Sequence, residues 1–136
     1  MLSNLCPVSA GCDNLVRVYS PHAFRQTKLL QRHSSYVSSL AEIASILISG
    51  SKDKTFLLWD TSRNYTLVRK FECYQCVYCL RPTPFDNVFV SSGIDETSVQ
   101  FWHLKKSTVL SNHSTNGDEI NTITFLSDEE TFVMGT

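Results

Sequence analysis

The sequence predicts an all-β fold built from a repeated unit of about 40 residues, and three observations lead to this prediction. Three segments, residues 9–20, 49–60 and 92–103, align without gaps on an aromatic residue near their ends. Short runs of β-branched and aromatic residues alternate with turn residues along the chain. No window of about 11 residues or more carries the apolar periodicity of an amphipathic helix.

The aligned aromatic residues are Tyr19, Trp59 and Trp102, which are spaced by 40 and 43 residues. Each follows a turn that contains small or polar residues, and Ser92 falls on Ser49 when no gap is allowed. A regular spacing of this size is typical of repeat proteins, in which each copy is one supersecondary unit that buries its apolar face against its neighbours.

Residues 48–60, which end in Trp-Asp, resemble a WD40 strand–turn–strand segment, and the resemblance to the WD40 β-propeller family covers essentially the whole chain. It implies a partial propeller with two complete four-stranded blades between two partial ones. Because propellers usually have about four to eight blades, we expect further blades to lie outside this chain. The implied divisions of a single domain, residues 1–136, are a partial blade 1–32, blades 33–71 and 72–112, and a partial blade 113–136.

Apolar and β-branched runs predict the strands of the two complete blades. Arg69 on an outer strand fits an exposed edge that resists pairing with other chains. Ser39 and Cys79, at matching positions of two inner strands, are small enough for the narrow centre of a propeller. The predicted strands are residues 34–40, 47–49, 55–59 and 67–71 in one blade, and residues 76–80, 88–91 and 99–102 in the next.

The WD40 resemblance also implies a hydrogen-bonded structural tetrad of His33, Ser49, Asp53 and Trp59. A buried indole N–H needs an acceptor, and a buried carboxylate needs donors. The same residue types form hydrolase triads, but no Gly-x-Ser-x-Gly elbow surrounds Ser49, so the structural interpretation is preferred and no catalytic residue is assigned.

The other blades depart from this tetrad. In the blade of residues 72–112, Cys73 stands where the preceding blade has His33, and Glu96 replaces the turn aspartate. In the partial blade of residues 1–32, Tyr19 replaces the tryptophan. We therefore expect the tetrad in the blade of residues 33–71 alone.

The spacing of three cysteines, Cys73, Cys76 and Cys79, is compatible with a metal or cluster site. Positions 76 and 79 on a strand would face opposite sides, and no fourth ligand stands at a usual distance along the chain. Small reduced thiols are the preferred interpretation, so no metal and no cofactor are predicted.

The resemblance implies that partners bind the loops before the inner strands and the tight turns before the third strands. Tyrosine suits such a surface because it brings a large contact area at modest entropic cost. For each position taken alone, an ordinary loop residue is the alternative. The matching positions are Ser35, Tyr36, Lys52, Gln75, Cys76, Asp95, Asp118 and Glu119.

The composition narrows the classes of partner and compartment. Twelve basic and 13 acidic residues give a net charge of −1, which provides no general attraction to nucleic acid or to a membrane surface. Lys105 and Lys106, with His103, form a cluster too small to indicate nucleic-acid binding. Five cysteines without a secretion signal favour an intracellular chain, cytoplasmic or nuclear, with reduced thiols.

The predicted function is a non-catalytic scaffold or adaptor that presents propeller loops to partner proteins in a multiprotein complex. One alternative is a subunit of an RNA-processing, ribosome-assembly or chromatin complex, with only indirect contact to nucleic acid. Another is a propeller-based enzyme, which would need convergent polar residues in a pocket. No small-molecule substrate, cofactor or membrane partner is predicted.

Overall fold

The computed structural model describes residues 6–93, 98–106, 108–114, 120–126 and 131–135. These residues form thirteen strands and no helix, in antiparallel sheets of three, four, four and two strands, so the predicted all-β partial propeller is confirmed. No helix of the described ranges is long and apolar enough to span a bilayer.

Each sheet is built from consecutive hairpins, so its strand order follows the chain. The first sheet holds β1 (Val8–Ala10), β2 (Val16–Tyr19) and β3 (Gln26–Leu30). The second holds β4 (Val37–Ile43), β5 (Ile46–Ser51), β6 (Thr55–Asp60) and β7 (Thr66–Glu72). The third holds β8 (Val77–Pro82), β9 (Val88–Gly93), β10 (Ser98–His103) and β11 (Thr108–Ser114), and the fourth holds β12 (Thr122–Phe125) and β13 (Phe132–Gly135).

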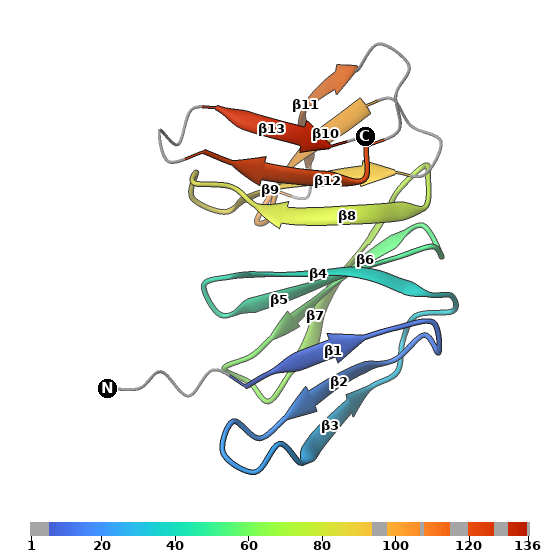
Figure 1. Cartoon of the computed structure of the whole chain (residues 1–136), viewed down its shortest axis with the longest axis vertical. Coiled ribbons are helices and arrows are strands. Elements are labelled where there is room, and N and C mark those ends of the chain that lie inside the picture. Colours follow the sequence, from blue (N-terminus) through green and yellow to red (C-terminus); the bar gives the residue numbers. More distant parts are fainter. Residues whose placement is uncertain (1–5, 94–97, 107, 115–119, 127–130, 136) are drawn as a thin grey trace.

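The four sheets stack face to face along the long axis of the molecule (Figure 1). Strand β4 contacts β1 of the first sheet and β8 of the third, and β8 also contacts β12, so these strands line one side of the stack. Hydrogen bonds join the two middle sheets there. Ser38 donates to the Val77 carbonyl at 2.5 Å, and the Leu80 N–H donates to Ser39 Oγ at 3.0 Å.

An apolar layer fills each of the three spaces between sheets. Strands β5 and β6 are buried on both faces, which explains why their apolar residues run almost without interruption rather than alternating. The outer strands β7 and β11 are mostly exposed. Trp59 lies in the layer between the first and second sheets, and Trp102 lies in the layer between the second and third.

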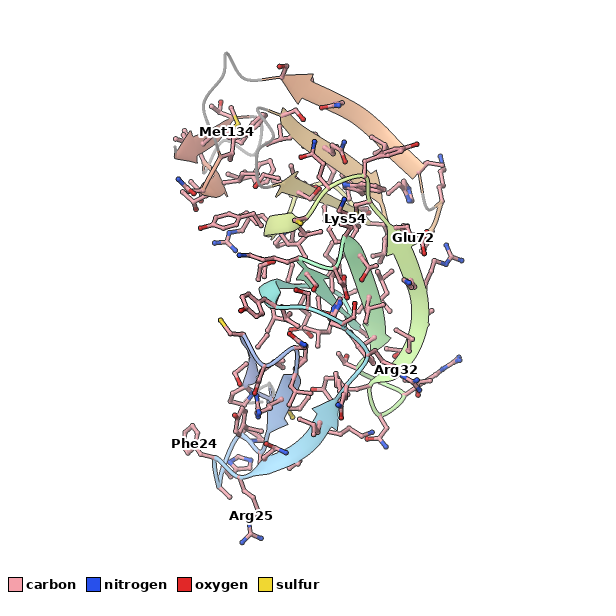
Figure 2. The ribbon with its side chains drawn as sticks, turned by 90° about the vertical axis from the view of Figure 1, so that its right-hand side faces the viewer. Phe24, Arg25, Arg32, Lys54, Glu72 and Met134 are labelled. Carbon is pink, nitrogen blue, oxygen red and sulfur yellow. The ribbon has the colours of Figure 1, made fainter. Side chains whose placement is uncertain are left out.

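Left-handed backbone positions mark several of the hairpin turns. Lys54 has a φ of 66° and its carbonyl accepts the Cys73 N–H at 2.8 Å, which ties the β5–β6 turn to the chain entering the third sheet. Figure 2 labels Lys54 in this turn and Glu72 at the end of β7. Phe24, with a φ of 48° and 76% of its surface exposed, projects from the β2–β3 hairpin at one end of the stack.

Most strand bounds differ from the predicted ones by one to three residues. Strand β4 begins at Val37 rather than at residue 34, because Asp53 accepts the Ser34 N–H and Ser51 donates to the Ser35 carbonyl, which holds these residues in a loop. Strand β8 begins at Val77 and extends to Pro82, one residue after the predicted start at residue 76 and two residues past the predicted end at residue 80. The division into blades at residues 32, 71 and 112 remains a prediction, and β7 and β11 run slightly past two of these limits.

Candidate functional site

The structure brings the four tetrad residues together in one hydrogen-bonded chain. Trp59 Nε1 donates to Ser49 Oγ at 3.0 Å, and Ser49 Oγ lies 2.8 Å from His33 Nε2. His33 Nδ1 lies 2.9 Å from Asp53 Oδ2. The neutral tautomer of His33 with its proton on Nδ1 satisfies every one of these contacts, because Nε2 then accepts the Ser49 hydroxyl proton.

Asp53 is the branching point of this network. Its carboxylate accepts the Ser34 N–H at 3.0 Å and the Thr55 hydroxyl at 2.6 Å, in addition to the contact with His33. Burial raises the pKa of Asp53, but the hydrogen bonds from Thr55, Ser34 and His33 outweigh burial and hold that pKa below its ordinary value. Asp53 therefore fixes both the loop before β4 and the β5–β6 turn.

Two members of the network were not among the predicted residues. Thr55 bonds Asp53 through its hydroxyl and its N–H, and Thr55 Oγ1 also lies 3.3 Å from His33 Nδ1. Ser51 Oγ accepts the Asp53 N–H at 3.0 Å. A serine and a threonine two residues either side of an aspartate in a turn are a recognisable signal for such side-chain-to-backbone bonds.

A serine on the strand opposite contacts the repeat aromatic residue in each of the first three sheets. Ser9 Oγ lies 3.2 Å from the Tyr19 hydroxyl, and Trp102 Nε1 donates to Ser91 Oγ at 2.9 Å. The gapless alignment that sets Ser92 on Ser49 is therefore wrong by one residue. Ser91 lies opposite Gln100 as Ser49 lies opposite Leu57, so the third sheet has one more residue between its serine and its tryptophan.

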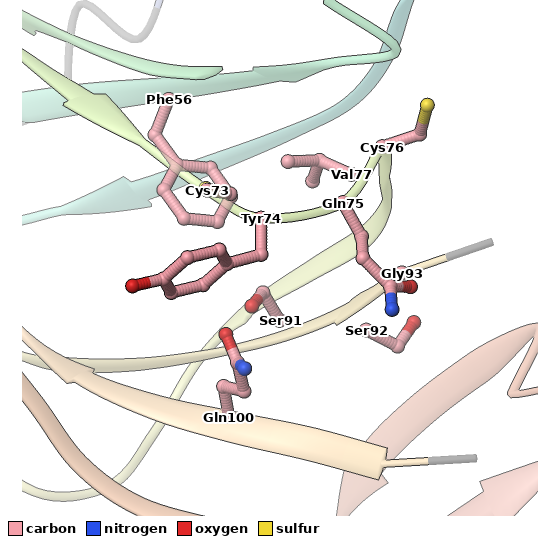
Figure 3. Close-up of a pocket in the computed structure, with 10 residues that line it drawn as sticks. All are labelled: Phe56, Cys73, Tyr74, Gln75, Cys76, Val77, Ser91, Ser92, Gly93 and Gln100. Atoms are coloured by element: carbon pink, nitrogen blue, oxygen red, sulfur yellow. The ribbon is translucent and has the colours of Figure 1, made fainter. Parts of the chain in front are cut away.

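The third sheet lacks a counterpart of the His33–Asp53 pair among its described residues. Cys73, Gln75, Ser91 and Gly93 border a cavity of only about 10 Å³ there (Figure 3). Gln75 Oε1 is buried and has no hydrogen-bond partner within the described chain. A Cβ at Gly93 would lie 3.2 Å from this oxygen, so little room is left beside it. Glu96, which replaces the turn aspartate, lies outside the described residues.

Four of the predicted partner-binding residues form one continuous surface, which we name the loop face: Ser35, Tyr36, Lys52 and Cys76. The Lys52 N–H donates to the Tyr36 carbonyl at 2.9 Å, and Lys52 Nζ lies 5.3 Å from the centre of the Tyr36 ring. Cys76 Sγ donates to the Lys52 carbonyl at 3.1 Å. The loop before β4, the β5–β6 turn and the loop before β8 are thus held together.

Of the remaining predicted partner-binding residues, the structure describes Gln75 alone. Gln75 adjoins Cys76, but its side chain points toward Gly93 while that of Cys76 points away (Figure 3). Asp95, Asp118 and Glu119 lie outside the described residues.

A hollow of about 560 Å³ adjoins the loop face on the side of the inner strands. Tyr36 and Lys52 form one wall, and Tyr78 and Arg81 of β8 form another. Tyr36 is 47% exposed and Tyr78 is 40% exposed, so both rings are accessible from solvent. Tyrosine and arginine are enriched among the residues that dominate protein interfaces.

The cysteines offer no metal centre within the described ranges. No group of three or more His, Cys, Asp or Glu side chains there is arranged to hold a metal ion, and no disulfide links any of the five cysteines. Cys79 is buried and Cys12 is exposed.

Comparison with known proteins matches residues 24–60 to the family model of the WD domain, G-beta repeat. Mitochondrial division protein 1 is 39% identical over 62 residues in both Aspergillus terreus and Neosartorya fischeri, covering 46% of this chain. The probable coatomer subunit beta' of Schizosaccharomyces pombe is 29% identical over 97 residues, or 69% of this chain. The matched parts are only 9–12% of these relatives.

The matched segment and the sheets have different limits. Residues 24–60 include β3, the outer strand of the first sheet, together with β4, β5 and β6 of the second. The tetrad residues His33, Ser49, Asp53 and Trp59 all fall inside this segment. The repeat spacing, the stacked antiparallel sheets and the family match agree that the chain contains a WD40 repeat and is similar to WD40-repeat proteins.

Proposed function

We propose that this chain is a non-catalytic protein-interaction scaffold that works inside the cell and binds a partner protein through the loop face. The WD40 repeat supports a role in protein interaction in general. One relative is named as a subunit of a larger assembly and two are named for mitochondrial division, which supports an intracellular, multiprotein setting.

The burial of the tetrad supports a structural rather than a catalytic role for it. Ser49 has no exposed surface and His33 is only 7% exposed, so a substrate has no access to the Ser49 hydroxyl. That hydroxyl also accepts a hydrogen bond from Trp59, which a nucleophilic serine does not need. The network instead fixes the loops that carry Tyr36 and Lys52.

The observation that carries the proposal is the pairing of Tyr36 with Lys52 on a rigid loop face. The ammonium group over the ring restrains both side chains, and the backbone bond between the two residues fixes the loops beneath them. A preorganised aromatic anchor beside a cation loses little conformational entropy when a partner binds.

Site-specific photocrosslinking in cells tests this proposal. We would replace Tyr36 with the photoreactive aromatic residue benzoylphenylalanine and, as a matched control, replace Phe24, which is 76% exposed in the β2–β3 hairpin. We expect a discrete crosslinked protein from position 36 that is lost when Lys52→Glu is added, and none of that species from position 24. Equal crosslinking from both positions, or none from position 36, would contradict the proposal.

A further inference from the structure

A second groove lies between the second and third sheets, at the opposite end of the strands from the loop face. Its walls are the β4–β5 turn with Ala44 and Ser45, the β8–β9 turn with Asn87, and the β10–β11 turn with Lys105. The groove has a volume of about 440 Å³, which falls within the usual range of about 300–1,000 Å³ for ligand pockets.

The floor of this groove is apolar. Leu58 and Leu104 are buried beneath it, Ile46 is half-buried at its side, and Val68 is 55% exposed at its rim. Because the rim residues are accessible, the groove is an open cleft rather than a sealed cavity. An open cleft of this kind suits the side chains of an extended segment better than a small molecule that needs complete enclosure.

Two cations border the groove, and none of its lining residues among those the structure describes is acidic. Arg69 of β7 reaches across the gap between the sheets, where its Nη1 donates to the Lys105 carbonyl at 3.2 Å. No carboxylate of the described residues lies within ion-pair distance of Lys105. An apolar floor with cations at its edge is complementary to aliphatic side chains flanked by carboxylates.

Hydrogen bonds hold the walls of the groove in place. The Leu104 N–H donates to the Asn87 carbonyl at 2.7 Å, which joins two turns of the third sheet. The N–H and the hydroxyl of Thr61 both donate to the Ser45 carbonyl, at 2.8 and 3.0 Å. The groove is therefore formed before any ligand arrives, so a ligand need not order these turns on binding.

From this geometry we infer that the groove binds an extended peptide segment of a partner protein in which aliphatic residues alternate with acidic ones. The aliphatic side chains lie on Ile46, Leu58 and Leu104, and the carboxylates pair with Arg69 and Lys105. This site is separate from the loop face, so it would give the scaffold a second point of attachment on its other end.

Methyl NMR of the purified protein, titrated with a capped tetrapeptide of alternating leucine and aspartate, tests the inference. We expect saturable shifts in the methyl signals of Ile46, Leu58 and Val68. The matched peptide with asparagine in place of aspartate should bind more weakly, by about threefold for each lost charge pair, as for other exposed ion pairs. Shifts that are absent up to millimolar peptide, or equal for both peptides, would overturn the inference.

Exposed variants separate local recognition from general attraction between charges. Arg69→Gln and Lys105→Gln should each weaken the aspartate peptide by about threefold. Lys106→Gln removes the same charge one residue away, outside the lining of the groove, and should leave the affinity unchanged. All three side chains are exposed, so the fold should survive. An equal loss of affinity in Lys106→Gln would overturn the inference. It would also be overturned if octanoate bound more tightly than the peptide, as measured at the same methyl signals.

Discussion

The hydroxyl of Ser49 is the hydrogen-bond partner of two buried groups, the Trp59 indole N–H and His33 Nε2. It accepts the Trp59 indole proton and contacts His33 Nε2, and its own surface is fully buried. A buried polar group that loses its partner keeps the full cost of having left water. The stability of the second sheet should therefore depend on this single hydroxyl.

Ser49→Ala should lower the free energy of unfolding by about 1–3 kcal/mol, because the Trp59 N–H and His33 Nε2 would both be left without their partner. Urea unfolding followed by circular dichroism would measure the change. Ser45→Ala is a matched control, since Ser45 is exposed in the β4–β5 turn and should cost little. Equal unfolding midpoints for the two variants would contradict the importance of the tetrad.

Asp53 should make stability depend on pH in the acid range. Its pKa is lowered in the folded protein from an ordinary value of 3.8, so the unfolded chain binds a proton more readily there. The stabilisation is complete well above the ordinary value and is lost as the pH falls through it toward the lowered value. We expect the difference in unfolding free energy between the wild type and Asp53→Asn to shrink from pH 7 to pH 3.

This comparison isolates Asp53 from the other carboxylates. The pKa of Asp13 is lowered by its hydrogen bond with Arg17, and that of Asp60 by its hydrogen bond with Ser62. Both remain in the wild type and in the variant, so their contributions cancel in the difference. A gap that stays constant from pH 7 to pH 3 would contradict the expected role of Asp53.

The resemblance to WD40 repeats was enough to predict which four side chains meet in the tetrad, because it assigns His33, Ser49, Asp53 and Trp59 to matching positions. It did not reveal Thr55 or the one-residue offset at Ser91. Spacing along the chain cannot show whether a turn contains an extra residue, and only the strand register shows that Ser91, not Ser92, lies opposite Gln100. The groove with Arg69 and Lys105 was also missed, because its walls come from turns far apart in sequence.

Among the elements, the buried strands were the easiest to predict and the inner-strand limits the hardest. Strands β6 and β9 contain apolar or aromatic runs because both of their faces pack against neighbouring sheets. The start of β4 depends instead on hydrogen bonds from a turn 15 or more residues away, as between Ser51 and Ser35. Such a contact leaves no trace in local residue preferences.

Close packing between β5 and β8 depends on the absence of a side chain at Gly50. A Cβ there would lie 2.5 Å from Val77 Cγ1 and 2.8 Å from Leu80 Cδ1, closer than real carbon atoms approach. Gly50→Ala should therefore destabilise the protein by about 1–3 kcal/mol through overpacking. Thermal unfolding would measure this, with Gly11→Ala as the control, because a Cβ at Gly11 meets only Asp13 Oδ1 at 3.8 Å. A milder effect at Gly50 than at Gly11 would be inconsistent with this packing.

At the scale of the whole molecule, stability is distributed over the layers between neighbouring sheets. Phe56 of the second sheet packs edge-on against Phe89 and Trp102 of the third, with ring centres 5.5 and 5.2 Å apart. Only adjacent sheets share such layers, so the effect of a change in one layer should fade with distance along the stack.

Phe56→Leu should cost about 1–3 kcal/mol, because two aromatic pairs are lost at once. Hydrogen exchange would report where the cost falls. We expect protection to decrease most in β5 and β9, which flank the changed layer, and less in β2 of the first sheet. Phe85→Leu, at an exposed position, provides the baseline. An equal decrease in all sheets would indicate a single cooperative unit instead.

The matched WD40 segment starts just before β3, the outermost strand of one sheet, and stops one strand short of completing the next. The unit of sequence and the unit of folding are therefore out of phase by one strand. Genetic excision along the limits of the repeat would remove β3 from its own sheet and leave β7 without the strand it pairs with, so one event would damage two sheets. Cuts in the connections between β3 and β4 or between β7 and β8 would keep each sheet intact. The offset also means that every repeat of this kind ties two sheets together through a covalent chain.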